Sequence, residues 1–304
     1  MNLQSILNKV AQYGYRVKTV SATRLPEIQE AVGKLIRQGL ISEELFKKWH
    51  FYLSTNTELS EATTIIIIAI PQPITRLTFR CQGMTYLADI PPTYFYKADE
   101  FRIQDILTSL MSDAGYKIVK ARIALKTLAV RSGLAEYGRN NISYVPGIGS
   151  FYRLTAFYTD YPCEDDNWQE PGVLKACDNC SLCQQACPTG SILVDRFLIK
   201  AENCLGSLAE RVPDIPHWVR LQPEWPNALI GCMSCQSVCP VNTPYLNNIK
   251  EGISFSEEES NSILRKIPFE HLAPETREKF QDTFETFYYY MTQNLGELIK
   301  KQNC

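Results

Sequence analysis

The apolar residues of the first 160 positions alternate between helical and strand spacing. The segments NLQSILNKVAQYGY and LPEIQEAVGKLIRQGL repeat apolar residues every three or four positions, and the second has a glycine near its end. This spacing places the apolar side chains on one face of a helix. The run TTIIIIAI has no polar alternation, is rich in β-branched residues and is followed by Pro71 and Pro73. It therefore predicts a strand that is buried on both faces.

The same two patterns return between residues 98 and 160. ADEFRIQDILTSLMSDAGY and LKTLAVRSGL have helical spacing, whereas YKIVKA and FYRLTAFYTD have the composition and alternation of strands. Helices that alternate with strands favour a domain built of packed layers. We therefore predict an α+β protein in which residues 1–162 form a layered α/β domain that binds a ligand.

The pattern changes near Pro162. From there to about Asn248, cysteine, proline and small polar residues dominate, and apolar periodicity is weak. Such a segment buries little hydrocarbon, so we expect bound metal to hold residues 163–250 together.

Helical spacing returns over residues 251–304. One apolar stripe contains Phe280, Phe284, Phe287, Tyr288, Met291, Leu295 and Leu298. A stripe of this kind predicts C-terminal helices that pack on the body of the protein, with a partner-binding face as the alternative.

Composition and charge narrow the classes of partner. The chain has 304 residues, of which 45% are hydrophobic and 21% are charged, and its net charge is −2. Residues 164–214 contain nine acidic and four basic side chains, a net charge of −5, so the cysteine-rich region lacks the basic footprint of a nucleic-acid-binding surface. We therefore do not expect nucleic acid as a partner.

The N-terminus and the apolar runs indicate the compartment. The start MNLQSILNKV has no charged segment followed by a long apolar one, and the longest apolar run, Ile65–Ile70, is too short to span a bilayer. We expect a cytoplasmic protein that does not bind a membrane. Thiols are kept reduced in the cytoplasm, so metal ligation explains most of the 11 cysteines better than disulfides do.

The first cysteine group predicts iron–sulfur ligation. It has the spacing C-x2-C-x2-C-x3-C, is followed by Pro188, and consists of Cys177, Cys180, Cys183 and Cys187. Bacterial two-cluster ferredoxins use this run, and their fourth cysteine binds the other cluster. Two-residue gaps let three thiolates surround one corner of a cube, while the fourth points away towards a second cube.

The second group, GCMSCQSVCP, has three cysteines with a proline after the last. By the same logic, the first cluster is bound by Cys177, Cys180, Cys183 and Cys239. The second cluster is bound by Cys187, Cys232 and Cys235, and Cys204 of AENCLGSL is the candidate for its fourth ligand. The sequence thus predicts two [4Fe-4S] clusters, each of which is bound by one cysteine from the run that supplies the other cluster.

Zinc and purely structural clusters are the alternatives. A tetrahedral zinc site would need two C-x2-C pairs and gives no reason for a proline after each group. Clusters that only hold a small domain together are a second alternative. Cys81, Cys163 and Cys304 match no motif and are expected to be buried or idle thiols, with a catalytic role as the alternative.

Polar residues beside glycines are the candidates for a ligand site. GLAEYGRNN predicts a loop that presents Tyr137, Arg139 and Asn141, and the glycine turn GIGS contains Ser150. Loops such as GLAEYGRNN position ligands, although a plain surface connection is an equal alternative. Most glycine turns such as GIGS are only turns, but such a turn lets the backbone approach a ligand closely. No residue is identified from the sequence as catalytic.

Residues 60–250 resemble the double-cluster family that includes epoxyqueuosine reductase and, more distantly, corrinoid reductive dehalogenases. The resemblance rests on TTIIIIAI, LAVRSGL-x-x-x-G-R-N, GS-F-x-R-L, CDNCSLCQQACPTGSI and GCMSCQSVCPVN, and it includes the displaced Cys204. It implies a nitroreductase-like or cobalamin-reductase-like domain that holds cobalamin against a ferredoxin-like domain. It also implies an electron donor such as a ferredoxin or flavodoxin.

The sequence departs from the reductase at three places. The family's acidic positions fall at about Val119 or Lys120 and at about Leu125, and its G-W-x-G-K motif becomes AEYGRN. The C-terminal helical repeats are reduced to a short tail. The resemblance is therefore to shorter double-cluster proteins, without the tRNA substrate.

Two functions follow as hypotheses. In the first, the protein is an iron–sulfur oxidoreductase that passes single electrons through both clusters to a small-molecule or corrinoid ligand of the N-terminal domain. In the second, it is a non-catalytic electron carrier that reduces a partner protein.

Overall fold

The protein consists of two compact units, each built from separated stretches of the chain. The computed structural model describes residues 2–41, 59–94, 98–208, 225–280 and 288–303. The first unit contains Met1–Gln72 and Lys97–Ser181, and the second contains Pro73–Tyr96 and Leu182–Cys304. The second unit is therefore built from two segments of the chain, which are separated in the sequence by residues 97–181 of the first unit.

A four-stranded antiparallel sheet forms the centre of the first unit. Its order is β1 (Arg16–Ser21), β2 (Thr64–Pro71), β8 (Tyr152–Thr159) and β5 (Ile118–Lys120). All but the last residue of β2 are buried, as the isoleucine run predicts.

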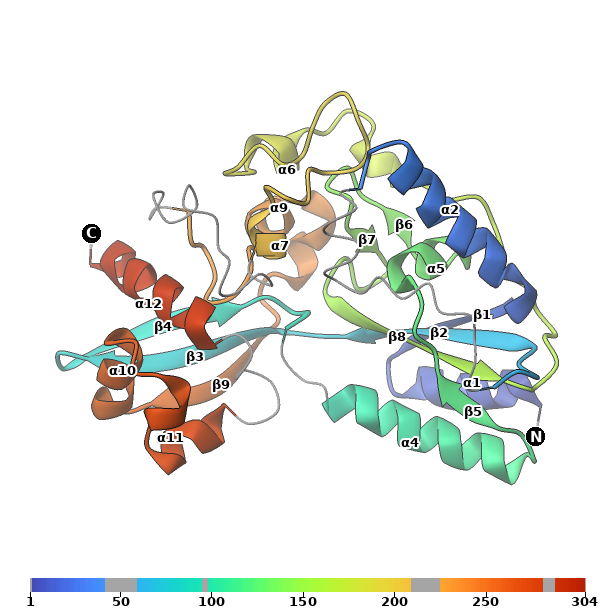
Figure 1. The fold of residues 1–304 in the computed structure, drawn as a ribbon, viewed down its shortest axis with the longest axis horizontal. Helices are drawn as coiled ribbons and strands as arrows, with labels where there is room; N and C mark the ends of the chain where they lie inside the picture. Colours follow the sequence, from blue (N-terminus) through green and yellow to red (C-terminus); the bar gives the residue numbers. More distant parts are fainter. Residues whose placement is uncertain (1, 42–58, 95–97, 209–224, 281–287, 304) are drawn as a thin grey trace. The chain divides into compact units, whose positions relative to one another are not determined.

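Helices cover both faces of this sheet (Figure 1). They are α1 (Leu3–Gln12) and α4 (Ala98–Asp113) on one face, and α2 (Leu25–Arg37) and α5 (Leu125–Arg131) on the other. Ile66 and Ile68 pack on the first face, while Ile65 and Ile67 pack on the second. This sandwich confirms the mixed α and β layers, and each fully buried isoleucine contributes about 1.5–3 kcal/mol.

A short hairpin follows α5 in the first unit. Its strands are β6 (Glu136–Tyr137) and β7 (Ser143–Tyr144), and residues 138–142 form the turn. Asn141 has a φ of 58°, a left-handed conformation that asparagine tolerates better than most residues. The hairpin also pairs with residues 172–174, because the Tyr137 N–H donates to Gly172 O and the Leu174 N–H donates to Tyr137 O.

The second unit contains a three-stranded sheet that the sequence analysis did not assign. Its order is β4 (Met84–Ile90), β3 (Ile74–Cys81) and β9 (Ile249–Phe255), with β3 antiparallel to β4 and parallel to β9. Residues 74–90 belong with the C-terminal part of the chain because β3 pairs with β9. The predicted linear domains 1–162, 163–250 and 251–304 do not coincide with these units.

The core of the second unit is aromatic. The helices α10 (Glu257–Leu264), α11 (Pro274–Lys279) and α12 (Tyr288–Gln302) follow β9. Phe79 and Phe255 stack at 4.9 Å, and Phe280 contacts Phe255 and Tyr288. The described part of the predicted C-terminal stripe is therefore core, while Phe284 and Phe287 lie outside the described residues.

Short helices interrupt the cysteine-rich segment. They are the 3-10 helix η2 (Lys175–Cys177), α6 (Leu182–Gln185), α7 (Leu205–Leu208), α9 (Ser234–Ser237) and the 3-10 helix η3 (Pro240–Tyr245). Among the helices that the structure describes, none is both long enough and apolar enough to cross a membrane.

Candidate iron–sulfur centre

The two predicted ligand sets occupy different parts of the chain. The four cysteines of the second set, Cys187, Cys204, Cys232 and Cys235, all belong to the second unit. In the first set, Cys177 and Cys180 end the first unit, whereas Cys183 and Cys239 belong to the second. The ten cysteines that the structure describes are all free thiols, as ligands of a cluster must be.

Cys204 lies beside other members of its predicted set. Burial raises the pKa of the Cys204 thiol, and the Cys232 and Cys187 thiols are near enough to raise it further. Thiols crowded in this way repel one another as thiolates unless a cation neutralises them. The role of Cys204 as the fourth ligand of this set stays a prediction, with Cys187 and Cys232 as its neighbours.

Cys187 accepts several hydrogen bonds from the turn that follows it. The Ser191 N–H donates to Cys187 Sγ at 3.3 Å, and the Thr189 hydroxyl lies 3.7 Å from this sulfur. Burial alone would raise the pKa of Cys187, but hydrogen bonds from Thr189, Ser191 and Ile192 outweigh it and lower the pKa. These donors favour the thiolate, which is the form that binds iron.

Asn227 holds the loop that contains Cys232. Its Nδ2 donates to Cys232 Sγ at 3.2 Å and to Ser234 Oγ at 2.8 Å, and its Oδ1 accepts from the Met233 N–H at 2.7 Å. Gly231 begins this loop with a φ of +68°, and a Cβ added there would lie 2.8 Å from the Tyr94 ring. The loop thus requires glycine for both its backbone conformation and its space.

The two cysteine groups have similar local structures. Cys183 lies in α6 and Cys235 lies in α9, and these two helices pack against each other. Cys187 and Cys239 each follow the end of one of these helices. Pro240 begins η3, where the missing N–H of proline costs no hydrogen bond.

In the first unit, Cys177 contacts Arg139. The Arg139 backbone N–H donates to Cys177 Sγ at 3.4 Å, and Arg139 Nη2 donates to Cys177 O at 2.6 Å. Arg139 lies in the turn between β6 and β7, so this turn is joined directly to the cysteine loop.

The other predicted ligand-binding residues lie in or near the same hairpin. Asn141 is 7% exposed, and its carbonyl oxygen and Oδ1 accept hydrogen bonds from Lys126 Nζ at 2.8 and 3.1 Å. Tyr137 shares a hydrogen bond with Thr127, and burial raises its pKa. Ser150 is buried and immediately precedes the segment that leads into β8.

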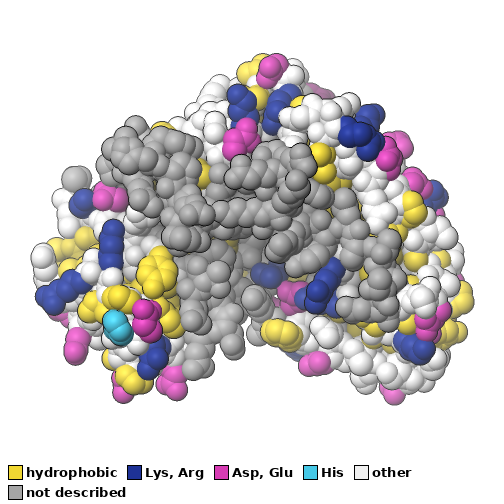
Figure 2. All heavy atoms as spheres, viewed as in Figure 1, with side chains coloured by type: hydrophobic (Ala, Val, Ile, Leu, Met, Phe, Trp, Pro, Cys, Tyr) yellow, Lys and Arg dark blue, Asp and Glu magenta, His cyan; other side chains and the backbone are white. Residues whose placement is uncertain are grey.

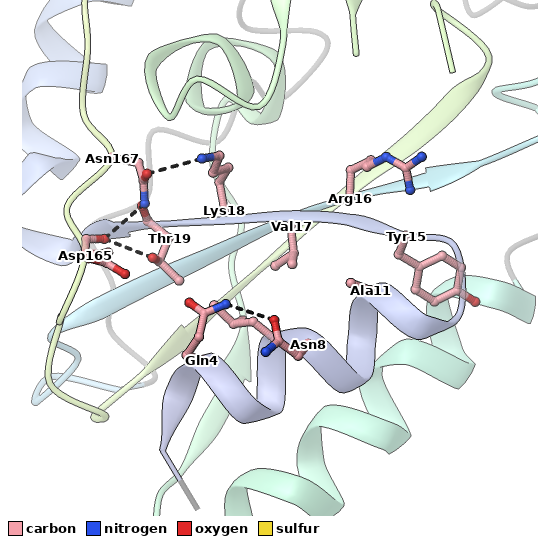
Figure 3. Close-up of a pocket in the computed structure, with 11 residues that line it drawn as sticks. Gln4, Asn8, Ala11, Tyr15, Arg16, Val17, Lys18, Thr19, Asp165 and Asn167 are labelled. Carbon is pink, nitrogen blue, oxygen red and sulfur yellow. Dashed lines mark hydrogen bonds between the residues drawn. The ribbon is translucent and has the colours of Figure 1, made fainter. Parts of the chain in front are cut away.

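A groove of about 340 Å³ lies elsewhere in the first unit (Figure 3). It is formed by α1, by β1 and by residues 165–167, and its polar side chains include Arg16, Lys18 and Asn167. Lys18 Nζ donates to Asn167 Oδ1 at 3.3 Å. None of the four predicted ligand-binding residues lines this groove.

A buried ionic network on the central sheet was missed by the sequence analysis. Glu100 of α4 accepts hydrogen bonds from Lys120 of β5 and, at 2.9 Å, from Arg153 Nε of β8. The only signals in the sequence were Lys120 at the end of the short strand IVK and Arg153 near the start of β8.

The donor set fits iron–sulfur clusters. Seven of the eight cysteines occur in two runs and Cys204 lies between these runs, while three sulfurs of the second set accept hydrogen bonds or lie beside one another. Among the described residues, no three His, Cys, Asp or Glu side chains are grouped to bind a single metal ion.

Comparison with known proteins supports the resemblance inferred from the sequence. Residues 176–242 match the family model described as a 4Fe-4S double cluster binding domain. Epoxyqueuosine reductase of Bacillus subtilis (strain 168) is 31% identical over 139 residues, which are 46% of this chain and 33% of that protein. The match thus spans about a third of the length of this curated relative.

Solved structures show the same fold over nearly the whole chain. Epoxyqueuosine reductase from Streptococcus thermophilus matches with a TM-score of 0.66 and 20% identity, covering 98% of this chain and 82% of that one. An epoxyqueuosine reductase with an epoxyqueuosine-modified tRNA-Tyr stem loop matches with a TM-score of 0.66 and 18% identity, covering 97% and 81%. The predicted mixed α+β fold with a 4Fe-4S binding domain is confirmed.

Proposed function

We propose that this chain is an iron–sulfur oxidoreductase related to the epoxyqueuosine reductases. The observation that supports it most strongly is the double-cluster match over residues 176–242, which contains all eight cysteines of the two predicted sets. The structure adds the proximity of Cys204 to Cys187 and Cys232.

The cysteines would bind two [4Fe-4S] clusters with the ligand sets predicted above. Such clusters exchange single electrons at potentials that depend on burial and on hydrogen bonds to sulfur. The chain's own contribution is to hold the thiolates and supply donors such as Ser191 and Asn227. A soluble ferredoxin or flavodoxin is the proposed electron donor, and we propose a cytoplasmic location.

The ligand domain is proposed to hold the electron acceptor near the β6–β7 hairpin. Tyr137, Arg139, Asn141 and Ser150 are the residues proposed to bind it, and a corrinoid is the ligand that the resemblance implies. The carrier hypothesis is less favoured, because curated relatives similar to this chain, such as the one from Bacillus subtilis (strain 168), are named as reductases.

Nucleic acid is the partner on which our expectation and the comparisons differ. One similar structure contains a tRNA stem loop, whereas residues 164–214 of this chain have nine acidic and four basic side chains. On the face drawn in Figure 2, the coloured Lys and Arg side chains are interspersed with Asp and Glu. We therefore propose a substrate other than tRNA, and a gel-shift assay with a tRNA-Tyr anticodon stem loop would test this choice.

The decisive experiment is anaerobic purification followed by metal analysis. We expect brown protein with about eight irons per chain, as two [4Fe-4S] clusters require. Colourless protein, or protein that contains zinc in place of iron, would refute the proposed function.

A second measurement separates the two hypotheses. The reconstituted protein is incubated with hydroxocobalamin under anaerobic conditions, desalted and examined by absorption spectroscopy. A retained corrinoid supports the oxidoreductase, whereas iron-loaded protein that retains none supports the carrier.

A further inference from the structure

Arg139 makes an unusual set of contacts with the loop that contains Cys177. Its Nη2 donates to Cys177 O at 2.6 Å and lies 3.4 Å from Asp178 O, while its backbone N–H donates to Cys177 Sγ. Its Nε is buried and has no hydrogen-bond partner among the described residues. One residue therefore brings a permanent positive charge, a donor to sulfur and an unused buried donor to the same loop.

The hairpin that contains Arg139 also fixes the approach to this loop. Residues 172–174 pair with Tyr137 through two backbone hydrogen bonds of 2.9 and 2.8 Å. The chain then reaches Cys177 three residues later, where the Arg139 side chain binds the backbone again. The loop is thus held at two successive points by one hairpin of the first unit.

The donors described for the second set are neutral. Cys187 accepts from the Ser191 N–H and Cys232 accepts from the Asn227 amide. Reduction adds a negative charge to a cluster, and a nearby cation stabilises the charged state more strongly than a neutral dipole does. The partly buried position of Arg139 reduces screening by water and salt.

We infer that Arg139 is a positioning residue for the cluster bound by Cys177, and that its guanidinium raises the reduction potential of this cluster. The hydrogen bond to its carbonyl oxygen holds Cys177 in place. Because the guanidinium stabilises the reduced state of this cluster, an electron that moves between the two clusters resides more often on this one. This inference rests on the proposed function only for the assignment of Cys177 as a cluster ligand. It gives Arg139 a role independent of any bound corrinoid.

The test is a redox titration of anaerobically purified full-length protein, followed by electron paramagnetic resonance. In Arg139→Gln we expect one midpoint potential to become more negative while the other stays unchanged. Arg139→Lys keeps the charge but loses the planar fork, so its shift should be smaller. Arg131→Gln is the matched control, because Arg131 pairs with the exposed Glu170 and should leave both potentials unchanged.

The outcomes are distinct. Unchanged potentials in an Arg139→Gln protein with about eight irons would overturn the inference, as would a shift of both potentials. Loss of about half the iron, with one centre retained, would support the positioning role. If Arg139→Gln does not fold, the charge-removing variant Arg139→Met takes its place, and wild-type potentials in that variant would overturn the inference. Wild-type protein without iron would instead refute the proposed function itself.

Discussion

Glu100 is the buried acid of the first unit, and its replacement tests how the central sheet is stabilised. The residue is 8% exposed, and its carboxylate accepts hydrogen bonds from Arg153 Nε at 2.9 Å and from Lys120 Nζ. Thr155 Oγ1 lies 3.4 Å from Oε1. Burial alone would raise the pKa of Glu100, but Lys120 and Arg153 outweigh it and lower the pKa.

The expected cost of Glu100→Gln follows from these contacts. A hydrogen bond to a charged group contributes about 1.5–3 kcal/mol. The Lys120 side chain is 46% exposed, so its share is small, whereas Arg153 is 26% exposed and loses its charged partner. The glutamine oxygen still accepts one bond. We therefore expect the free energy of unfolding to fall by about 2 kcal/mol, which lowers the Tm by about 4–8 °C.

The pH dependence gives a second readout with a defined sign. The folded-state pKa of Glu100 lies below its unfolded value of about 4.3, so its stabilisation is present above that pH and is lost as pH falls through the folded pKa. Wild type and Glu100→Gln should therefore differ fully at pH 7, and the difference should shrink as pH falls through the lowered pKa of Glu100.

Thermal unfolding followed by circular dichroism, at matched iron content, measures both effects. Glu61→Gln is the control, because Glu61 pairs with Lys117 at the surface and should have little effect at pH 7. A Glu100→Gln Tm equal to that of wild type would refute this account of the network. So would a difference that persists unchanged at low pH.

Three further variants test other parts of the structure. Cys204→Ala should leave one cluster intact and give roughly half the iron content or a three-iron centre. Cys81→Ser is the control and should keep the iron content of wild type. Unchanged iron content in Cys204→Ala would contradict the ligand set. Gly231→Ala should lower the free energy of unfolding in urea more than Gly190→Ala does. Both glycines have a positive φ, but only Gly231 faces a tyrosine ring. Equal losses of unfolding free energy in the two variants would contradict this expectation. Ile67→Ala should cost about 2–5 kcal/mol in the same assay, and a loss below about 1 kcal/mol would show that the site collapses.

Local pattern was sufficient for several elements of the first unit, but it did not assign β1 or the strands β6 and β7, which lie in and beside the predicted loop. The isoleucine run of β2 has no polar position, so only a strand covered on both faces can bury it. The helices α1, α2 and α4 were likewise predicted, because their apolar spacing returns every three or four residues.

The sheet of the second unit depended on distant parts of the chain. β3 alternates as ITRLTFRC, but its parallel partner β9 lies about 175 positions later, with Ile74 opposite Ile249. No local pattern specifies such a pairing, because its energy comes from side chains that meet only after folding. The division of the chain into two units follows from this pairing.

The sequence by itself determined the spacing of the cysteines, because short gaps between ligands restrict where neighbouring thiolates can reach. The resulting ligand sets remain a prediction. Only the tertiary structure decided which groups lie near these sulfurs, since Arg139 reaches Cys177 across 38 positions. It likewise decided the ionic network of the central sheet, in which Glu100 meets Arg153 across 53 positions. Electrostatic interactions depend on distance in space and on burial, and neither is encoded in the separation of two residues along the chain.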